Sequence, residues 1–224
     1  TKVVAAEALQ CPTLLLGGYG SHRIEGIGDK HVPWIHNIKT TDVVAGIDDQ
    51  ACMSLLRLFN EPEGRTYLKG RDVDPDLVDR LDLLGISCIA NLLTAIKTAR
   101  FFEMGPKDML FTVATDSMEL YGSRLEEERE LNGPYSETLA AVHHEHHLLG
   151  AGIDHMLELG YWDRKRIHNL KYFTWIEQQG KMVEELDAQW YDDDYWTTHF
   201  HAWEEWDRQI DEFNERTGLL ERYR

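Results

Sequence analysis

A run of histidines, from His143 to His147, is the densest set of potential metal ligands and proton carriers in the chain. It reads His-His-Glu-His-His, so on a helix His143 and His147 lie one turn apart on the same face. That spacing can chelate a transition metal, with Asp154 further along the face. The pattern is not H-E-x-x-H, because Leu148 stands where the second ligand is needed. A metal site and a solvated or interface-facing histidine cluster both remain open, and we expect no bound metal.

A second candidate site combines a glycine string with a serine that follows an apolar run. The string covers residues 22–28 and contains Gly26, Ile27 and Gly28. Glycine suits a ligand site because a missing Cβ lets the main chain approach a flat ring closely. Ser117 follows the apolar run 109–114. If that run is a strand, Ser117 lies near its carboxyl end, where open α/β sheets bind ligands; the alternative is a serine that only satisfies nearby backbone groups.

Three short apolar runs predict the strands that would position these residues. Each is rich in Val, Ala or other apolar residues and is followed by a loop or a helical pattern, as expected for buried strands of a mainly parallel sheet. The runs are Lys2–Glu7, Thr41–Ala45 and Met109–Ala114. Strands that alternate with helices indicate an α/β fold, with a three-layer arrangement of helices on both faces of the sheet.

Helical spacing predicts one helix over residues 50–60, capped by Asp48-Asp49, and another over residues 90–101, with Ser87 as its cap. After about Tyr121 the strand-like runs end, and long charged and aromatic stretches take over. We therefore expect residues 1–125 to form the α/β part and residues 126–224 to form an acidic, all-helical extension. Six of the seven tryptophans lie in this extension, where we expect them to act as apolar packing anchors.

Composition excludes several classes of partner. Forty acidic residues against 23 basic ones give a formal charge of −17, which repels nucleic acid and anionic lipid surfaces. No apolar run reaches the ~18 residues of a membrane-spanning helix. The cysteines at positions 11, 52 and 88 are odd in number and lack C-x-x-C spacing, so they suggest neither a disulfide framework nor a zinc cluster. A reducing cytoplasm is the expected location.

Three blocks of sequence, in order, resemble the C-terminal half of the cysteine synthase and cystathionine β-synthase family of fold-type II pyridoxal-phosphate (PLP) enzymes. The glycine string is similar to the family's H-x-I-x-G-I-G, and Ser117 takes the place of the serine in P-[DS]-S-G-E-R-Y. Met118 and Leu120 depart from that second motif. The blocks are residues 2–8 with 22–28, residues 48–51 with 63–64 and 85–87, and residues 111–121. The resemblance covers about residues 1–125.

This resemblance implies a PLP site formed by Gly26, Ile27, Gly28 and Ser117. A serine hydroxyl opposite the pyridine nitrogen leaves the ring largely unprotonated, which suits β-elimination or β-replacement on a small amino-acid substrate. The family's Schiff-base lysine and phosphate loop precede the strand with which this sequence opens, and none of its nine lysines has a matching context. The resemblance therefore implies an N-terminal half, supplied as a subunit or segment, and a homodimer of the complete enzyme.

A different class of function also fits part of the sequence. A non-catalytic helical interaction module could bind a partner protein through the acidic, tryptophan-rich extension. Such a module would need neither the glycine string nor a serine at the end of a strand, whereas the enzyme-half interpretation accounts for both. We therefore favour the enzyme half.

Overall fold

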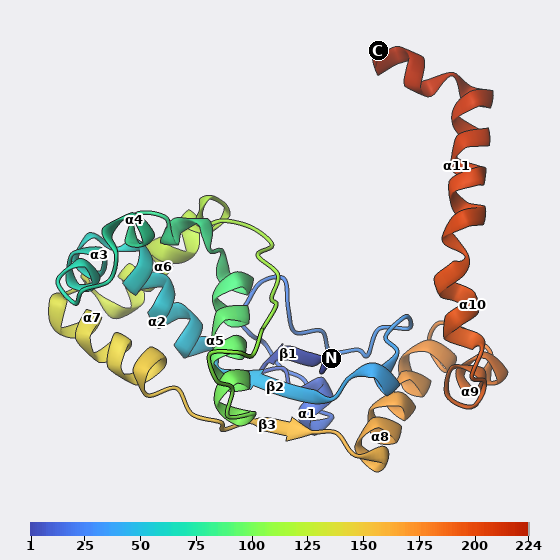
Figure 1. Ribbon diagram of the computed structural model, residues 1–224, viewed down its shortest axis with the longest axis horizontal. Helices are drawn as coiled ribbons and strands as arrows, with labels where there is room; N and C mark the ends of the chain where they lie inside the picture. Colours follow the sequence, from blue (N-terminus) through green and yellow to red (C-terminus); the bar gives the residue numbers. More distant parts are fainter. Residues whose placement is uncertain (224) are drawn as a thin grey trace.

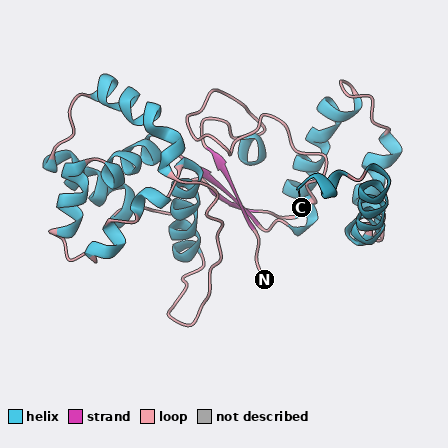
Figure 2. Cartoon of the chain, turned by 90° about the horizontal axis from the view of Figure 1, so that it is seen from above, coloured by secondary structure: helices cyan, strands magenta, loops and turns pink. Residues whose placement is uncertain are grey.

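The computed structural model describes residues 1–223 and shows a small sheet between two groups of helices (Figure 1). A helical lobe lies on one side of the sheet and a second group of helices lies on the other side (Figure 2). The second group continues into an arm, α10 and α11, that projects from the body (Figure 1). The α-helices are α1 Thr13–Leu16, α2 Asp49–Asn60, α3 Pro62–Lys69, α4 Pro75–Val78, α5 Ile86–Phe101, α6 Gly122–Asn132, α7 Glu137–His143, α8 Tyr161–Lys171, α9 Val183–Tyr191, α10 Tyr195–His201 and α11 Trp203–Thr217. One-turn π segments follow α7 at His144–Leu149 and α8 at Tyr172–Ile176.

The sheet has three strands in the order β1-β2-β3. Strand β1 (Val4–Ala8) runs parallel to β2 (Val43–Ile47), with Val4 opposite Val43. Strand β3 (Met156–Glu158) runs antiparallel to β2. All five residues of β2 are buried, as expected for an apolar run in the centre of a sheet.

Two helices beside the sheet confirm the predicted pattern with small changes. Asp48 caps α2, because its carboxylate accepts a hydrogen bond from the Ala51 N–H at 3.0 Å. Helix α5 starts four residues earlier than expected, with Gly85 and not Ser87 at its N-cap. The Ser87 hydroxyl is engaged elsewhere, 2.6 Å from the Thr115 hydroxyl. Helix α5 packs against both β1 and β2.

Two predictions about strands are wrong. Residues Met109–Ala114 form no strand; they run without regular structure, and Phe111 exposes 85% of its surface. An apolar run becomes a strand only when a neighbouring edge takes up its hydrogen bonds, and no strand of residues 1–223 pairs with this one. The region 126–224 is not all-helical, because β3 belongs to it and occupies the second edge of β2. The sheet is consequently mixed rather than mainly parallel.

Strand β2 separates two hydrophobic cores. Ile47 belongs to the core that includes Leu56 of α2 and Ile89 of α5, and Val44 belongs to the core that includes Ile167 of α8. Alternate side chains of a strand point to opposite faces of its sheet, so one short strand anchors both groups of helices. The architecture is α/β, with helices around a small mixed sheet. Among residues 1–223 no helix combines the length and the apolar composition that a membrane span requires.

Candidate functional site

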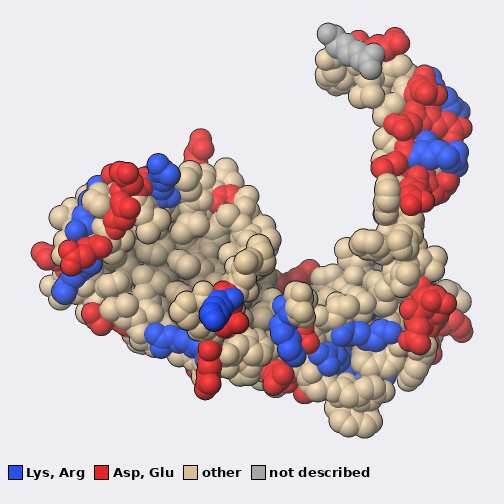
Figure 3. All heavy atoms as spheres, viewed as in Figure 1, with Lys and Arg blue, Asp and Glu red and all other residues tan. Residues whose placement is uncertain are grey.

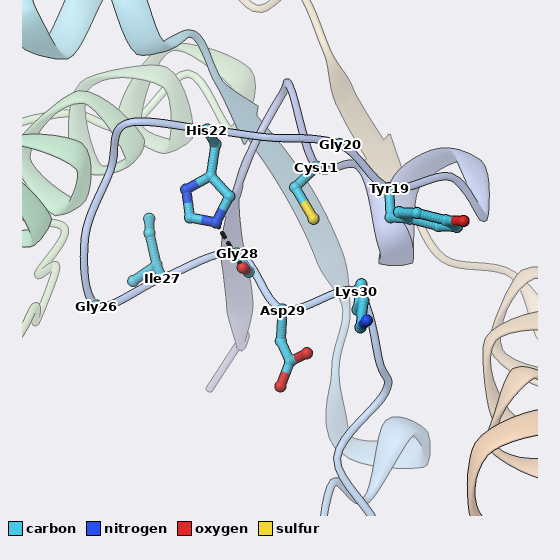
Figure 4. Close-up of a pocket in the computed structure, with 9 residues that line it drawn as sticks. All are labelled: Cys11, Tyr19, Gly20, His22, Gly26, Ile27, Gly28, Asp29 and Lys30. Carbon is cyan, nitrogen blue, oxygen red and sulfur yellow. Dashed lines mark hydrogen bonds between the residues drawn. The ribbon is translucent and has the colours of Figure 1, made fainter. Parts of the chain in front are cut away.

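The glycine string forms a cavity at the carboxyl end of β1. A Cβ placed on Gly28 would lie 3.2 Å from the Cβ of Ala8, the last residue of that strand. The cavity has a volume of about 450 Å³, and Figure 4 shows the residues that line it. Its lining residues are Cys11, Tyr19, Gly20, His22, Gly26, Ile27, Gly28, Asp29 and Lys30. Open α/β sheets bind ligands at this end of their strands.

The shape of the loop depends on Gly26 and Gly28. Both have positive φ, +88° and +92°, a conformation that side chains with a Cβ rarely adopt. The Nε2 atom of His22 donates a hydrogen bond to the Gly28 carbonyl at 2.7 Å (Figure 4). A Cβ on Gly28 would lie only 2.9 Å from that same Nε2 atom. The histidine therefore fixes the loop only if position 28 is glycine.

Ionic contacts hold the other side of the loop against the helical lobe. The Arg23 N–H donates to Asp49 Oδ2 at 2.7 Å, and the Arg23 guanidinium pairs with Glu128 of α6 at 2.7 Å. Burial raises the pKa of the Asp49 carboxyl. Glu25 forms an ion pair with Arg124. These contacts connect the loop to both α2 and α6, so its backbone is held in place around the cavity.

The glycine string and the segment before Ser117 meet at the amino end of α5. A Cβ on Gly26 would lie 3.5 Å from the Cβ of Ser87, and the Ser87 hydroxyl contacts Thr115 at 2.6 Å. The N–H of Gly85 donates to the Asp116 carbonyl at 3.0 Å. Three segments that are far apart in the sequence thus converge here.

The predicted site residues differ in what surrounds them. Ser117 is half-buried, and its hydroxyl makes no hydrogen bond with any residue that the structure describes. It is not among the residues that line the cavity of the glycine string. Ile27 lines the cavity and also packs against the core that contains α2 and α5.

Sequence reasoning missed several polar groups beside this junction. The buried Cys88 thiol accepts a hydrogen bond from the Thr115 N–H at 3.1 Å. Burial alone would raise the pKa of Cys88, but hydrogen bonds with Thr115 hold it below its ordinary value. The Tyr121 hydroxyl donates to Asp116 at 2.5 Å, and burial together with that carboxylate raises the pKa of Tyr121 to about 12. The adjacent Thr-Asp pair before Ser117 was the only local signal for these contacts.

His143 and His147 are neighbours, with ring centroids 5.9 Å apart, but they have different further partners. The Nδ1 atom of His143 lies 3.0 Å from the Tyr135 hydroxyl and 3.2 Å from the Ser54 carbonyl. His147 stacks on His146 with ring centroids 4.7 Å apart. Burial lowers the pKa of His143, and it lowers that of His147 to about 4. Within residues 1–223 no three His, Cys, Asp or Glu side chains are grouped as metal ligands.

Comparison with known proteins identifies no relative. No protein-family model, no curated protein and no solved structure matches the chain.

Proposed function

We propose that the chain is the C-terminal half of a PLP-dependent enzyme that carries out β-elimination or β-replacement on a small amino acid. One observation carries this proposal: segments around Gly26, Ser87 and Asp116, each part of a block that resembles the family, meet at the amino end of α5. The adjoining cavity opens at the carboxyl end of β1, the usual ligand position in such sheets.

In this proposal two groups of residues would hold the pyridine ring. The backbone of Gly26, Ile27 and Gly28 would border one part of the cofactor, because all three residues line the cavity. The free hydroxyl of Ser117 would donate a hydrogen bond to the pyridine nitrogen. When bound, PLP withdraws electrons from the Cα of the amino acid. A neutral hydroxyl moderates that withdrawal more than a carboxylate would, which favours reactions at Cβ.

In this proposal the α/β part belongs to a three-layer, fold-type II domain of which other strands lie outside the chain. An N-terminal half would supply the lysine that binds the cofactor, and the complete enzyme would be a homodimer in the cytoplasm. All three cysteines are free and buried, which suits a reducing compartment. Lys30 reaches the cavity rim, but it is exposed and lies outside the family's lysine context.

The test replaces Ser117 in the enzyme assembled from both halves. Ser117→Thr keeps the hydroxyl and should keep the cofactor affinity. Ser117→Ala removes one hydrogen bond, worth ~0.5–1.5 kcal/mol, and should weaken PLP binding about 2- to 10-fold. Ser117→Asp favours a protonated ring and should lower β-elimination of O-activated serine. The readouts are the absorption of bound PLP and steady-state turnover; equal spectra and rates in all three variants contradict the proposal.

A second candidate function, protein interaction through the arm, is favoured by the exposed face of α11. Trp203, Trp206, Ile210 and Phe213 each expose about half of their surface. These residues are spaced alternately three and four apart, so they form one apolar stripe along the helix. Such a stripe is the seam along which two helices pair. Acidic side chains crowd the arm (Figure 3), but Glu204, Glu205, Asp211 and Glu212 lie off this seam. We propose that the seam pairs with the same helix of a second copy.

Two variants separate the seam from the charged face of the same helix. Ile210→Glu places a carboxylate within the seam and should dissociate the pair. Glu212→Gln changes the charged face and serves as the matched control. Sedimentation velocity at several concentrations measures the mass. A monomer in the unmodified chain, or equal masses in both variants, contradicts helix pairing.

A further inference from the structure

Strand β1 leaves one edge of the sheet open. In a parallel pair the N–H and C=O groups of every second residue point to the same side of the strand. The Val3 carbonyl accepts from the Val43 N–H, and the Leu9 N–H donates to the Ile47 carbonyl, so the odd-numbered residues face β2. The N–H and C=O groups of Val4 and Ala6 therefore point away from the sheet, and β1 has no partner on that side among the described residues.

A second unpaired backbone lies across from this edge. Within the described chain, no backbone N–H of Met109–Ala114 donates to another backbone group. Near the end of the segment, Asn91 of α5 donates to the Val113 carbonyl at 2.9 Å. Phe111 and Val113 expose 85% and 65% of their surface. Figure 1 shows this connection running alongside α5.

A groove separates the two backbones. Its volume is about 740 Å³, with Val4 and Ala6 on one side, Leu110 and Phe111 on the other, and Thr94 of α5 also in its wall. Lys2 and Asp108 are the charged residues of its lining, and their opposite charges cancel. Because the lining has no net charge and its two sides carry apolar residues, the groove suits an uncharged segment with apolar side chains.

We propose that a single extended apolar strand of the amino-terminal half inserts into this groove, pairing with β1 on one edge and with Met109–Ala114 on the other. This inference rests on the proposed function, which supplies the amino-terminal half. A helix satisfies its own backbone groups, whereas both walls of the groove offer unpaired backbone, so a strand is the complementary occupant. Five residues of β1 span ~17 Å, the length of an ordinary strand. The insertion would turn Met109–Ala114 into a strand of an enlarged sheet.

Hydrogen–deuterium exchange of the chain, alone and in complex with the amino-terminal half, tests the insertion. In the complex the amides of Val4 and Ala6, and every second amide of residues 110–114, should exchange about 100-fold more slowly. A complex that binds PLP without this protection overturns the inference and leaves the proposed function standing. Protection without PLP binding supports the inference while the proposed function fails. Protection of the chain alone at high concentration indicates a second copy in the groove and overturns the inference.

A proline scan of β1 gives the matched variants. Ala6→Pro removes an outward N–H and should leave the free chain folded, with the affinity for the amino-terminal half reduced about tenfold. Ala6→Ser keeps that N–H and should bind normally. Ala5→Pro removes an inward N–H and should lower the stability of the free chain. Circular dichroism shows whether each variant is folded, urea unfolding measures its stability, and a binding titration measures its affinity for the amino-terminal half. If the Ala6→Pro protein is folded and binds with normal affinity, strand insertion is overturned.

Discussion

His168 should make the stability of the protein fall as the pH drops from 7 to 5. Its side chain is 2% exposed, and its Nε2–H donates to the Leu186 carbonyl at 3.1 Å, connecting α8 to α9. Burial, and then the positive charges of Lys171 and Lys165, lower its pKa to about 4. Its ordinary pKa is 6.5. Because the folded state resists protonation, the unfolded state binds more protons between these two values.

The size of the effect follows from those two pKa values. The stability associated with neutral His168 is present above about pH 6.5 and is lost as the pH falls toward the folded-state pKa. Between pH 7 and pH 5 the loss is about 2 kcal/mol, because each pKa unit corresponds to ~1.4 kcal/mol. Other histidines with a lowered pKa, including the half-buried His147, also make the stability of the unmodified protein depend on pH. The contribution of His168 must therefore be measured as a difference.

The measurement compares urea unfolding of the unmodified chain and of His168→Gln at pH 7 and pH 5. Glutamine keeps an N–H donor for the Leu186 carbonyl but does not titrate. We expect the unmodified chain to lose about 2 kcal/mol more than the variant over this interval. Equal losses in the two proteins would show that folding does not lower the pKa of His168, and they would refute this reasoning.

Two further predictions concern the glycine string and the histidine cluster. Gly28→Ala should lower the free energy of unfolding by ~2–4 kcal/mol, because φ is +92° and the new Cβ would lie 2.9 Å from His22 Nε2. Gly180→Ala is the control, because Gly180 also has a positive φ, +68°, but has open space around it; it should lose only the ~1–2 kcal/mol of backbone strain. Equal losses for the two variants in urea unfolding would argue against a close contact between position 28 and His22. The native protein should carry no stoichiometric zinc; about one zinc per chain by elemental analysis, lost on replacing His143 and His147 by Ala, would reverse that prediction.

Local signals in the sequence were sufficient for the elements that stabilise themselves. Helix α2 follows from the Asp48 cap and from apolar spacing, and both are properties of a few neighbouring residues. The apolar run at β2 likewise predicts a buried strand. The positive φ values at Gly26 and Gly28 also favour glycine, but for a reason of backbone conformation and not for the predicted approach to a flat ring.

Strand pairing shows where local signals fail. Met109–Ala114 has the same apolar character as β2, yet it is not a strand, because pairing depends on an edge supplied by a distant segment. Met156–Glu158 has only three residues and no distinctive pattern, yet it pairs because the second edge of β2 is free. Its local sequence therefore could not have predicted it.

For the candidate site, too, some features could be predicted from single residues and others depend on the tertiary structure. Residue types alone marked the glycine string and Ser117 as chemically capable, since the absence of a Cβ and the presence of a hydroxyl are properties of single residues. Only the tertiary structure brought Gly26 next to Ser87, and Ser87 next to Thr115. It also decided that His22 holds Gly28 and that His143 and His147 are partly buried. Burial and hydrogen-bond partners come from segments far apart in the chain, and the position of each segment depends on the packing of the whole.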